Sequence, residues 1–245
     1  MELAVVAFVI AIVLVAATAQ TLVGFGFALI AVPFLVVMLN VRDAIVVTTL
    51  LSLVNTTIIA AQARNDVPWR TVLWMLAGSL AGMPIGLAVL LFAPEDALRL
   101  AVGASTLVMA AALASGLRFG SSSVASELGV GFVSGVLNTS TSMNGPPVVL
   151  YLQSLGYPPQ AFRAGLAVFF VSVSVLTVAA FVATGVVSMN ALALAASALP
   201  AVVAGSVAGH ALLRRTQPEL FRRLVFALLI AAALSAVGSA AVRLA

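Results

Sequence analysis

The sequence predicts an all-α integral membrane protein with about eight transmembrane segments, arranged as two four-segment repeats in which the first helix is broken or re-entrant. Three observations lead to this fold class. Of the 245 residues, 63% are hydrophobic and only 7% are charged, whereas about a quarter of a soluble domain is charged. Charge-free runs recur at the length of about 20 residues that crosses a bilayer. Two longer runs, one opening each half, contain helix breakers.

Charge and cysteine usage exclude several classes of function. The net charge of +4 comes from eleven Arg and no Lys against seven acids, and in a membrane protein such a surplus is typical of cytoplasmic loops. Because no basic run is interleaved with aromatic residues, we expect no nucleic-acid partner. The absence of cysteine excludes disulfides and thiolate-ligated metals. We expect no metal site and no cofactor.

The charge-free runs set the segment boundaries. Four runs of 18 to 24 residues fit one span each, and a run of 50 residues, Ala164–Leu213, fits two spans with a turn near 184–190. The first repeat is expected over residues 1–119 and the second over 120–245. The predicted segments are 3–39, 44–63, 71–93 and 97–117 in the first repeat, and 126–155, 161–184, 189–213 and 221–242 in the second.

The two remaining runs are too long for one membrane span, and they barely have the length for two full spans and a turn. Leu3–Val41 has 39 residues and Leu128–Phe162 has 35. A continuous helix of the first length would measure about 58 Å, roughly twice the hydrocarbon thickness. Because both runs have breakers near the middle, we expect a broken or re-entrant helix in each.

Internal similarity relates the two halves. "PEDALRL" (94–100) parallels "PELFRRL" (218–224), and a glycine pair, Gly82 and Gly86, recurs 123 residues later as Gly205 and Gly209. An interrupted apolar segment at corresponding places in two halves is a sequence pointer to the binding site of a secondary transporter. Glycines spaced by four, beginning at Gly78, also predict close helix packing, either within a protomer or across a homodimer.

The arginines predict an orientation. With eight spans, seven of them, including Arg42, Arg99 and Arg163, lie on one side and four on the other. The positive-inside rule places the seven in the cytoplasm and both termini outside. If each broken segment is a true hairpin, the chain returns at that segment to the side from which it came. The loops that follow then change sides, and the two repeats become inverted.

The break in the second half carries the strongest signal for a site. Inside a bilayer, non-helical backbone persists only where protein or a watery cavity satisfies it. Proline suits a fresh helix start, and a helix starting there aims its positive end and free N–H groups into the break, which favours an anion. The candidate ligands are Asn138, Thr139, Ser140, Thr141, Ser142 and Asn144, with Gly145 and Pro146 at the restart. The alternative is a proline kink with Ser/Thr bonds between helices.

The first half and one arginine complete the candidate site. Its break supplies Gln20, Thr21, Gly24, Phe25, Gly26 and Phe27, with the phenylalanines as walls. Asn55, near the middle of the next span, either contacts substrate or bonds a neighbouring helix. Arg163 either binds an anion or reaches the interface as a loop residue.

Missing residue types narrow the mechanism. All seven acids lie at span edges or in loops, so we expect no intramembrane carboxylate that relays protons. Export of an anion runs down the inside-negative potential, about 2.3 kcal/mol per charge per 100 mV, and needs no coupling ion. A nucleophile with a base, paired acids or a metal site is missing, so we expect no enzyme.

"GFGFALIAVP" and "GVLNTSTSMNGPPVVLYL", one in each half, resemble the TauE/SafE family of sulfite and sulfonate exporters. The resemblance covers essentially the whole chain. It implies a multi-pass protein of the bacterial inner membrane, whose partners are a small anion and the lipid bilayer. Many members have a longer glycine run in these motifs, so Phe25 and Phe27 imply a differently shaped site. An anion channel of the same architecture is the alternative.

Overall fold

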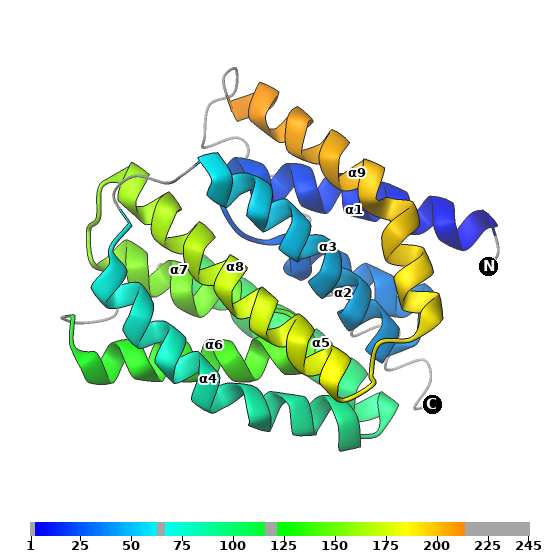
Figure 1. Ribbon diagram of the computed structural model, residues 1–245, viewed down its shortest axis with the longest axis horizontal. Coiled ribbons are helices and arrows are strands. Elements are labelled where there is room, and N and C mark those ends of the chain that lie inside the picture. The colour runs from blue at the N-terminus through cyan, green and yellow to red at the C-terminus, as the bar shows by residue number, and fades with distance from the viewer. Residues whose placement is uncertain (1–2, 63–66, 116–121, 214–245) are drawn as a thin grey trace.

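The computed structural model describes residues 3–62, 67–115 and 122–213, and every regular element in these ranges is an α-helix. Figure 1 shows them as a bundle of inclined helices. The elements are α1 (Leu3–Val23), α2 (Phe27–Met38), α3 (Val41–Gln62), α4 (Trp69–Phe92), α5 (Glu95–Ser115), α6 (Val124–Thr141), α7 (Gly145–Ser154), α8 (Pro159–Ala183) and α9 (Met189–Leu213).

Six of the described helices are long and apolar enough to cross a membrane: α1, α3, α4, α5, α8 and α9. The prediction of a helical membrane protein is therefore confirmed. The turn expected near 184–190 falls between Ala183 and Met189, because Gly185 supplies a positive φ of 69°. The predicted segment at 221–242 and the arginines from Arg214 onward lie outside the described residues.

Both long runs are interrupted as predicted. In the first run α1 ends at Val23 and α2 begins at Phe27, with Gly24 and Gly26 at φ values of 92° and 101°. Glycine adopts this left-handed backbone without steric cost. In the second run, the break is narrower than we expected, because 138–141 are still helical. It comprises Ser142, at φ 63°, to Asn144, and α7 restarts with prolines in its first turn.

One end of the bundle is defined by Arg42 and is called the Arg42 end. The Arg42 guanidinium, at the start of α3, donates to the carbonyls of Leu90 and Ala93 at the end of α4, at 2.9 and 2.8 Å. Arg99, near the start of α5, donates to carbonyls of Val36 and Leu39 at the end of α2. The start of α9 joins the same end, because Ser188 donates to Asp43 at 2.7 Å.

The opposite end is defined by Tyr157 and is called the Tyr157 end. Tyr157 precedes α8, and its hydroxyl lies 3.0 Å from that of Thr71 in the first turn of α4. Thr71 also donates to Glu127 at the start of α6. On α7, the hydroxyl of Tyr151 lies 3.0 Å from that of Ser126. The segment α6–α7 therefore leaves the Tyr157 end and returns to it.

The first broken segment enters from the other side. Gly205 of α9 lies against Leu14 and Ala17, and Gly209 lies against Thr18 and Thr21, so α1 runs parallel to α9 and begins at the Arg42 end. Since α2 finishes at that end, α1–α2 is also a hairpin. The two hairpins thus point into the bundle from opposite ends (Figure 1).

The hairpins correct the prediction of which loop arginines lie at the same end of the bundle. Arg163, expected on the same side as Arg42 and Arg99, lies at the Tyr157 end, where it donates to the Thr21 carbonyl at 3.1 Å. The physical reason is that the chain turns back at each break, so each broken run begins and ends at the same end of the bundle. Among the described arginines, Arg42 and Arg99 now share one end, and Arg70 and Arg163 share the other, so this count favours neither orientation.

Glycines set the closest helix contacts. An added Cβ at Gly78, Gly82 or Gly86 of α4 would lie 2.1 to 2.2 Å from backbone oxygens of α6, and one at Gly131 or Gly135 of α6 would meet α4 equally closely. The predicted glycine packing is therefore found within the protomer. Because α6 already covers this face of α4, the glycine spacing is no argument for a homodimer.

Candidate functional site

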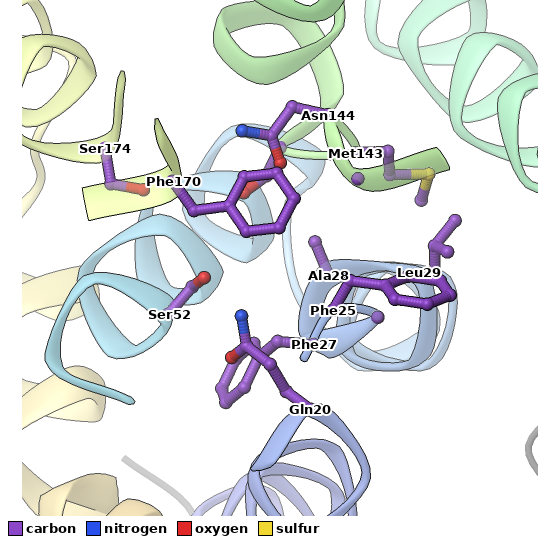
Figure 2. Close-up of a pocket in the computed structure, with 13 residues that line it drawn as sticks. Gln20, Phe25, Phe27, Ala28, Leu29, Ser52, Met143, Asn144, Phe170 and Ser174 are labelled. Atoms are coloured by element: carbon purple, nitrogen blue, oxygen red, sulfur yellow. The ribbon is translucent and has the colours of Figure 1, made fainter. Parts of the chain in front are cut away.

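The tips of the two hairpins meet around one cavity near the centre of the bundle. Its free volume is about 20 Å³, which is room for about one water molecule. Figure 2 shows side chains from both hairpins and from α3 and α8 pointing toward this space. The lining residues are Gln20, Phe25, Gly26, Phe27, Ala28, Leu29, Ser52, Ser142, Met143, Asn144, Gly145, Phe170 and Ser174.

The polar part of the lining is neutral. It consists of two amides, Gln20 and Asn144, and three hydroxyls, Ser52, Ser142 and Ser174, and no charged residue lines the cavity in the described part of the chain. Each of these groups can donate a hydrogen bond. The cavity can therefore surround an anion with donors without holding a fixed charge.

Two helix N-termini open onto the same space. Gly26 and Asn144 are the N-cap residues of α2 and α7, and neither helix has a side-chain cap hydrogen bond. The first N–H groups of a helix have no partner within the helix, and the helix dipole places partial positive charge there. Both hairpins therefore present positive helix ends to the cavity.

Aromatic side chains form the apolar wall. Phe25 and Phe27 come from the first hairpin and Phe170 from α8. Gly145 lies against Phe25, since an added Cβ there would be 3.5 Å from the ring. Phe170 is in turn held by an edge-to-face contact with Phe169, with ring centroids 5.8 Å apart. The wall excludes water from one side of the donor groups.

Helix α3 holds both tips. Near the Arg42 end, the Thr49 hydroxyl lies 3.0 Å from that of Ser142. Further along, Asn55 donates to Gln20 at 2.7 Å and Gln20 donates to Thr56 at 3.3 Å. Thr49 and Asn55 are six residues apart, or about 9 Å along a helix. Ser52 lies between them, so the cavity is at the middle of this span.

Helix α8, which packs against α3, makes the corresponding contact with the second hairpin. Asn138, in the last turn of α6, donates to Thr177 at 2.6 Å, as Gln20 in α1 bonds to α3. Asn138 and Thr177 are both buried. In each hairpin, an amide side chain just before the break therefore ties the tip to a neighbouring span.

The structure separates the predicted site residues into two groups. Those that line the cavity are Gln20, Phe25, Gly26, Phe27, Ser142, Asn144 and Gly145. Those that do not line it are Thr21, Gly24, Asn55, Asn138, Thr139, Ser140, Thr141, Pro146 and Arg163. Among the second group, the hydroxyls of Thr139, Ser140 and Thr141 donate to backbone carbonyls. For these three residues, the alternative of Ser/Thr bonds within and between helices describes the contacts.

Residues on α3 and α8 were missing from the sequence-based set. Ser52, Phe170 and Ser174 line the cavity, but each lies in an unbroken apolar helix with no local signal. Ser52 stands one turn before Asn55 on the span that we had already singled out. The helical spacing of three residues between them was the available clue.

The fold and cavity define a class: a helical membrane protein with a central cavity between two opposed helical hairpins. Residues 9–236 match the family model of Sulfite exporter TauE/SafE. The chain therefore belongs to the TauE/SafE sulfite exporter family, a family of membrane transporters. Searches of curated proteins and of solved structures gave no significant match.

Proposed function

We propose that this protein is a secondary transporter that carries a small anion, such as sulfite or a short sulfonate, across the bacterial inner membrane. The observation that carries the proposal is the central cavity, where two helix N-termini and five neutral donor side chains converge. Membership of the TauE/SafE sulfite exporter family supports the proposed substrate class. Export is the proposed direction, because the inside-negative potential drives an anion outward.

Neutral donors suit transport because the ligand must also leave. A buried arginine would bind the anion through charge-assisted hydrogen bonds and slow its release. Hydroxyls, amides and helix termini stabilise the anion by smaller amounts, with each helix terminus contributing about 0.3–1 kcal/mol at exposed sites. Asn144 is the residue we propose as the central ligand, because its side-chain amide lines the cavity and makes no hydrogen bond within the described part of the chain.

The architecture supports a two-fold mechanism. We propose that residues 1–119 and 120–245 form inverted repeats, since α1–α2 and α6–α7 enter from opposite ends and α1 packs on α9 as α6 packs on α4. In inverted-repeat transporters the two halves exchange conformations, so that the site opens to one side and then to the other. A site at the interface of the halves is where such an exchange would act.

The test is flux into liposomes containing the purified protein. Sulfite and methanesulfonate should enter saturably and should exchange with the same anion trapped inside. Asn144→Ala should raise the half-saturating concentration about 13- to 160-fold, since one hydrogen bond to a charged group contributes about 1.5–3 kcal/mol. Thr141→Ala is the matched control, because this hydroxyl donates to the Leu137 carbonyl. Equal effects of the two substitutions would contradict the proposed site.

An anion channel is the second candidate, because the same cavity could conduct if both ends opened together. Counterflow separates the two functions. A transporter accelerates uptake of labelled anion when unlabelled anion is trapped inside, whereas a channel gives a current that does not saturate. A current that does not saturate, without counterflow, would show that the protein is a channel. The proposed site would then stay the same.

A further inference from the structure

One carboxyl group is completely buried away from the central cavity. Glu127, in the first turn of α6, has 0% of its surface exposed. Its Oε1 accepts hydrogen bonds from the Thr71 hydroxyl at 3.0 Å and from the Ser122 hydroxyl at 3.1 Å. Its Oε2 is buried and has no hydrogen-bond partner. Glu127 lies at a span edge, as we expected of every acid, but it is buried there.

Hydroxyl partners accommodate both protonation states of this carboxyl. A hydroxyl donates to a carboxylate and, after rotating, accepts from a carboxylic acid. Thr71 is linked onward to the Tyr157 hydroxyl at 3.0 Å, so a second hydroxyl can adjust with it. The start of α6 favours negative charge through the helix dipole, while burial opposes charge. The hydroxyl partners can therefore follow a change in the protonation state of the carboxyl.

Within the described residues, no positively charged side chain forms an ion pair with the Glu127 carboxyl. The ion pair formed there, Arg99 with Glu95, is at the Arg42 end, as are the other charged residues of α5. Around Glu127 the titratable groups on neighbouring elements are Tyr157, Tyr151 on α7, the exposed Arg70 on α4 and Arg163 on α8, which bonds to Thr21. None of them is hydrogen-bonded to Glu127.

We propose that Glu127 is a proton-binding site, reached from the Tyr157 end, that couples proton movement to anion transport. Ionisable side chains inside membrane proteins commonly mark proton pathways. Ser122 and Ser123 are exposed and provide the entry. The coupling follows from position: Glu127 joins α6 to α4 directly, and Thr71 continues the link to Tyr157 before α8. Gain or loss of a proton changes how the α6–α7 hairpin is tied to α8, which lines the cavity.

The inference rests on the proposed transport function, and two independent readouts test it. The first is proton movement into liposomes driven by a gradient of methanesulfonate, which stays ionised at neutral pH, recorded with a pH-sensitive dye. The wild-type protein should move protons in the direction opposite to the anion, since the inside-negative potential then favours both movements. Its anion flux should vary with pH by up to about tenfold per unit, the limit for one required proton. Glu127→Gln should lose proton movement and the pH dependence.

The second readout is the infrared band of a protonated carboxyl, which needs no substrate. Wild-type protein should show a band that titrates and is missing from Glu127→Gln. Asp96→Asn is the matched control, because Asp96 is exposed at the Arg42 end, and it should retain both the band and proton movement. If Glu127→Gln does not fold, Thr71→Val replaces it. Losing a hydrogen-bond donor to the carboxyl should shift the frequency of the band.

The outcomes are separable. Proton movement that persists in Glu127→Gln, or a titrating band unchanged by Glu127→Gln and Thr71→Val, would overturn the proton site. Wild-type flux of methanesulfonate without proton movement would also overturn it, while the transport function stands. Absence of any anion flux in the wild type would contradict the transport function and the coupling to it, and the infrared titration would still decide whether Glu127 binds a proton.

Discussion

The hydroxyl of Thr49, on α3, lies 3.0 Å from the hydroxyl of Ser142 at the tip of the second hairpin. Thr49 also donates to the Ile45 carbonyl, so its hydroxyl is fixed by its own helix. The φ of 63° at Ser142 is the one positive value among described residues other than glycine. Such a conformation costs free energy and persists only when its surroundings hold it. Thr49 is therefore one of the groups that hold the tip in place.

Replacing Thr49 with Val should loosen this tip. The expected coupling free energy between Thr49 and Ser142 is about 0.6 kcal/mol, the average for hydrogen bonds between membrane helices, and at most about 1.7 kcal/mol. A double-mutant cycle of Thr49→Val with Ser142→Ala, measured by thermal unfolding in detergent, gives this value. Strictly additive effects would show that the two hydroxyls do not interact.

Closely packed glycines predict a large and local effect on stability. Gly82→Ala would bring its Cβ to 2.2 Å from the Phe132 carbonyl oxygen of α6, and overpacking of this kind typically costs 1–3 kcal/mol. Gly129→Ala is the control, because nothing lies within 4 Å of its Cβ and alanine favours helix by about 1 kcal/mol. The first variant should unfold at a lower temperature and the second should not. A common loss in both would contradict the α4–α6 packing.

Local signals made the hairpin tips predictable, whereas the contacts between them came from the three-dimensional arrangement. Gly24, Gly26 and the two prolines after Gly145 disrupt or start helices by their own backbone properties, so the breaks could be located in the sequence. Ser52 and Ser174 carry no such signal, because a serine on a membrane helix forms part of a site only through what faces it. The same limit applies to Glu127, whose burial depends on α4.

The side predicted for Arg163 was wrong for a related reason. A charge-free run of 39 residues fits a broken span and a hairpin equally well, since both bury the same apolar residues. The difference lies in the direction of α2 after Gly26, which the left-handed glycines permit but do not impose. Arg99, bonded to the carbonyls of Val36 and Leu39, fixes that direction, and this contact joins residues about 60 positions apart.

Arg163 should act on stability more than on substrate affinity. Its guanidinium is half-buried and donates to the Thr21 carbonyl near the end of α1, and it does not line the cavity. Arg163→Gln should therefore lower the free energy of unfolding by about 1.5–3 kcal/mol, the value of a hydrogen bond to a charged group. The half-saturating methanesulfonate concentration should change less than about threefold, below about 0.7 kcal/mol.

Flux and thermal unfolding, measured on the same preparation of Arg163→Gln, check this prediction. Arg163→Lys is the matched variant, since Lys keeps the charge but lacks the planar fork of donors. If Arg163 attracts the anion through charge alone, Lys would restore affinity. An affinity loss with Gln that Lys reverses would move Arg163 into the binding site.

Ser52 and Ser174 should contribute to binding from two neighbouring helices. They come from α3 and α8, and both line the space between the hairpin tips. Each hydroxyl would bond a charged ligand and is expected to contribute about 1.5–3 kcal/mol, so Ser52→Ala and Ser174→Ala should each raise the half-saturating concentration about 13- to 160-fold. Ser172→Ala is the control on α8, because its hydroxyl donates to the Val168 carbonyl and does not line the cavity. If one anion contacts both serines at once, the double variant should lose about the sum of the two free energies. A double variant no weaker than either single variant would place the two hydroxyls at separate steps of the transport path.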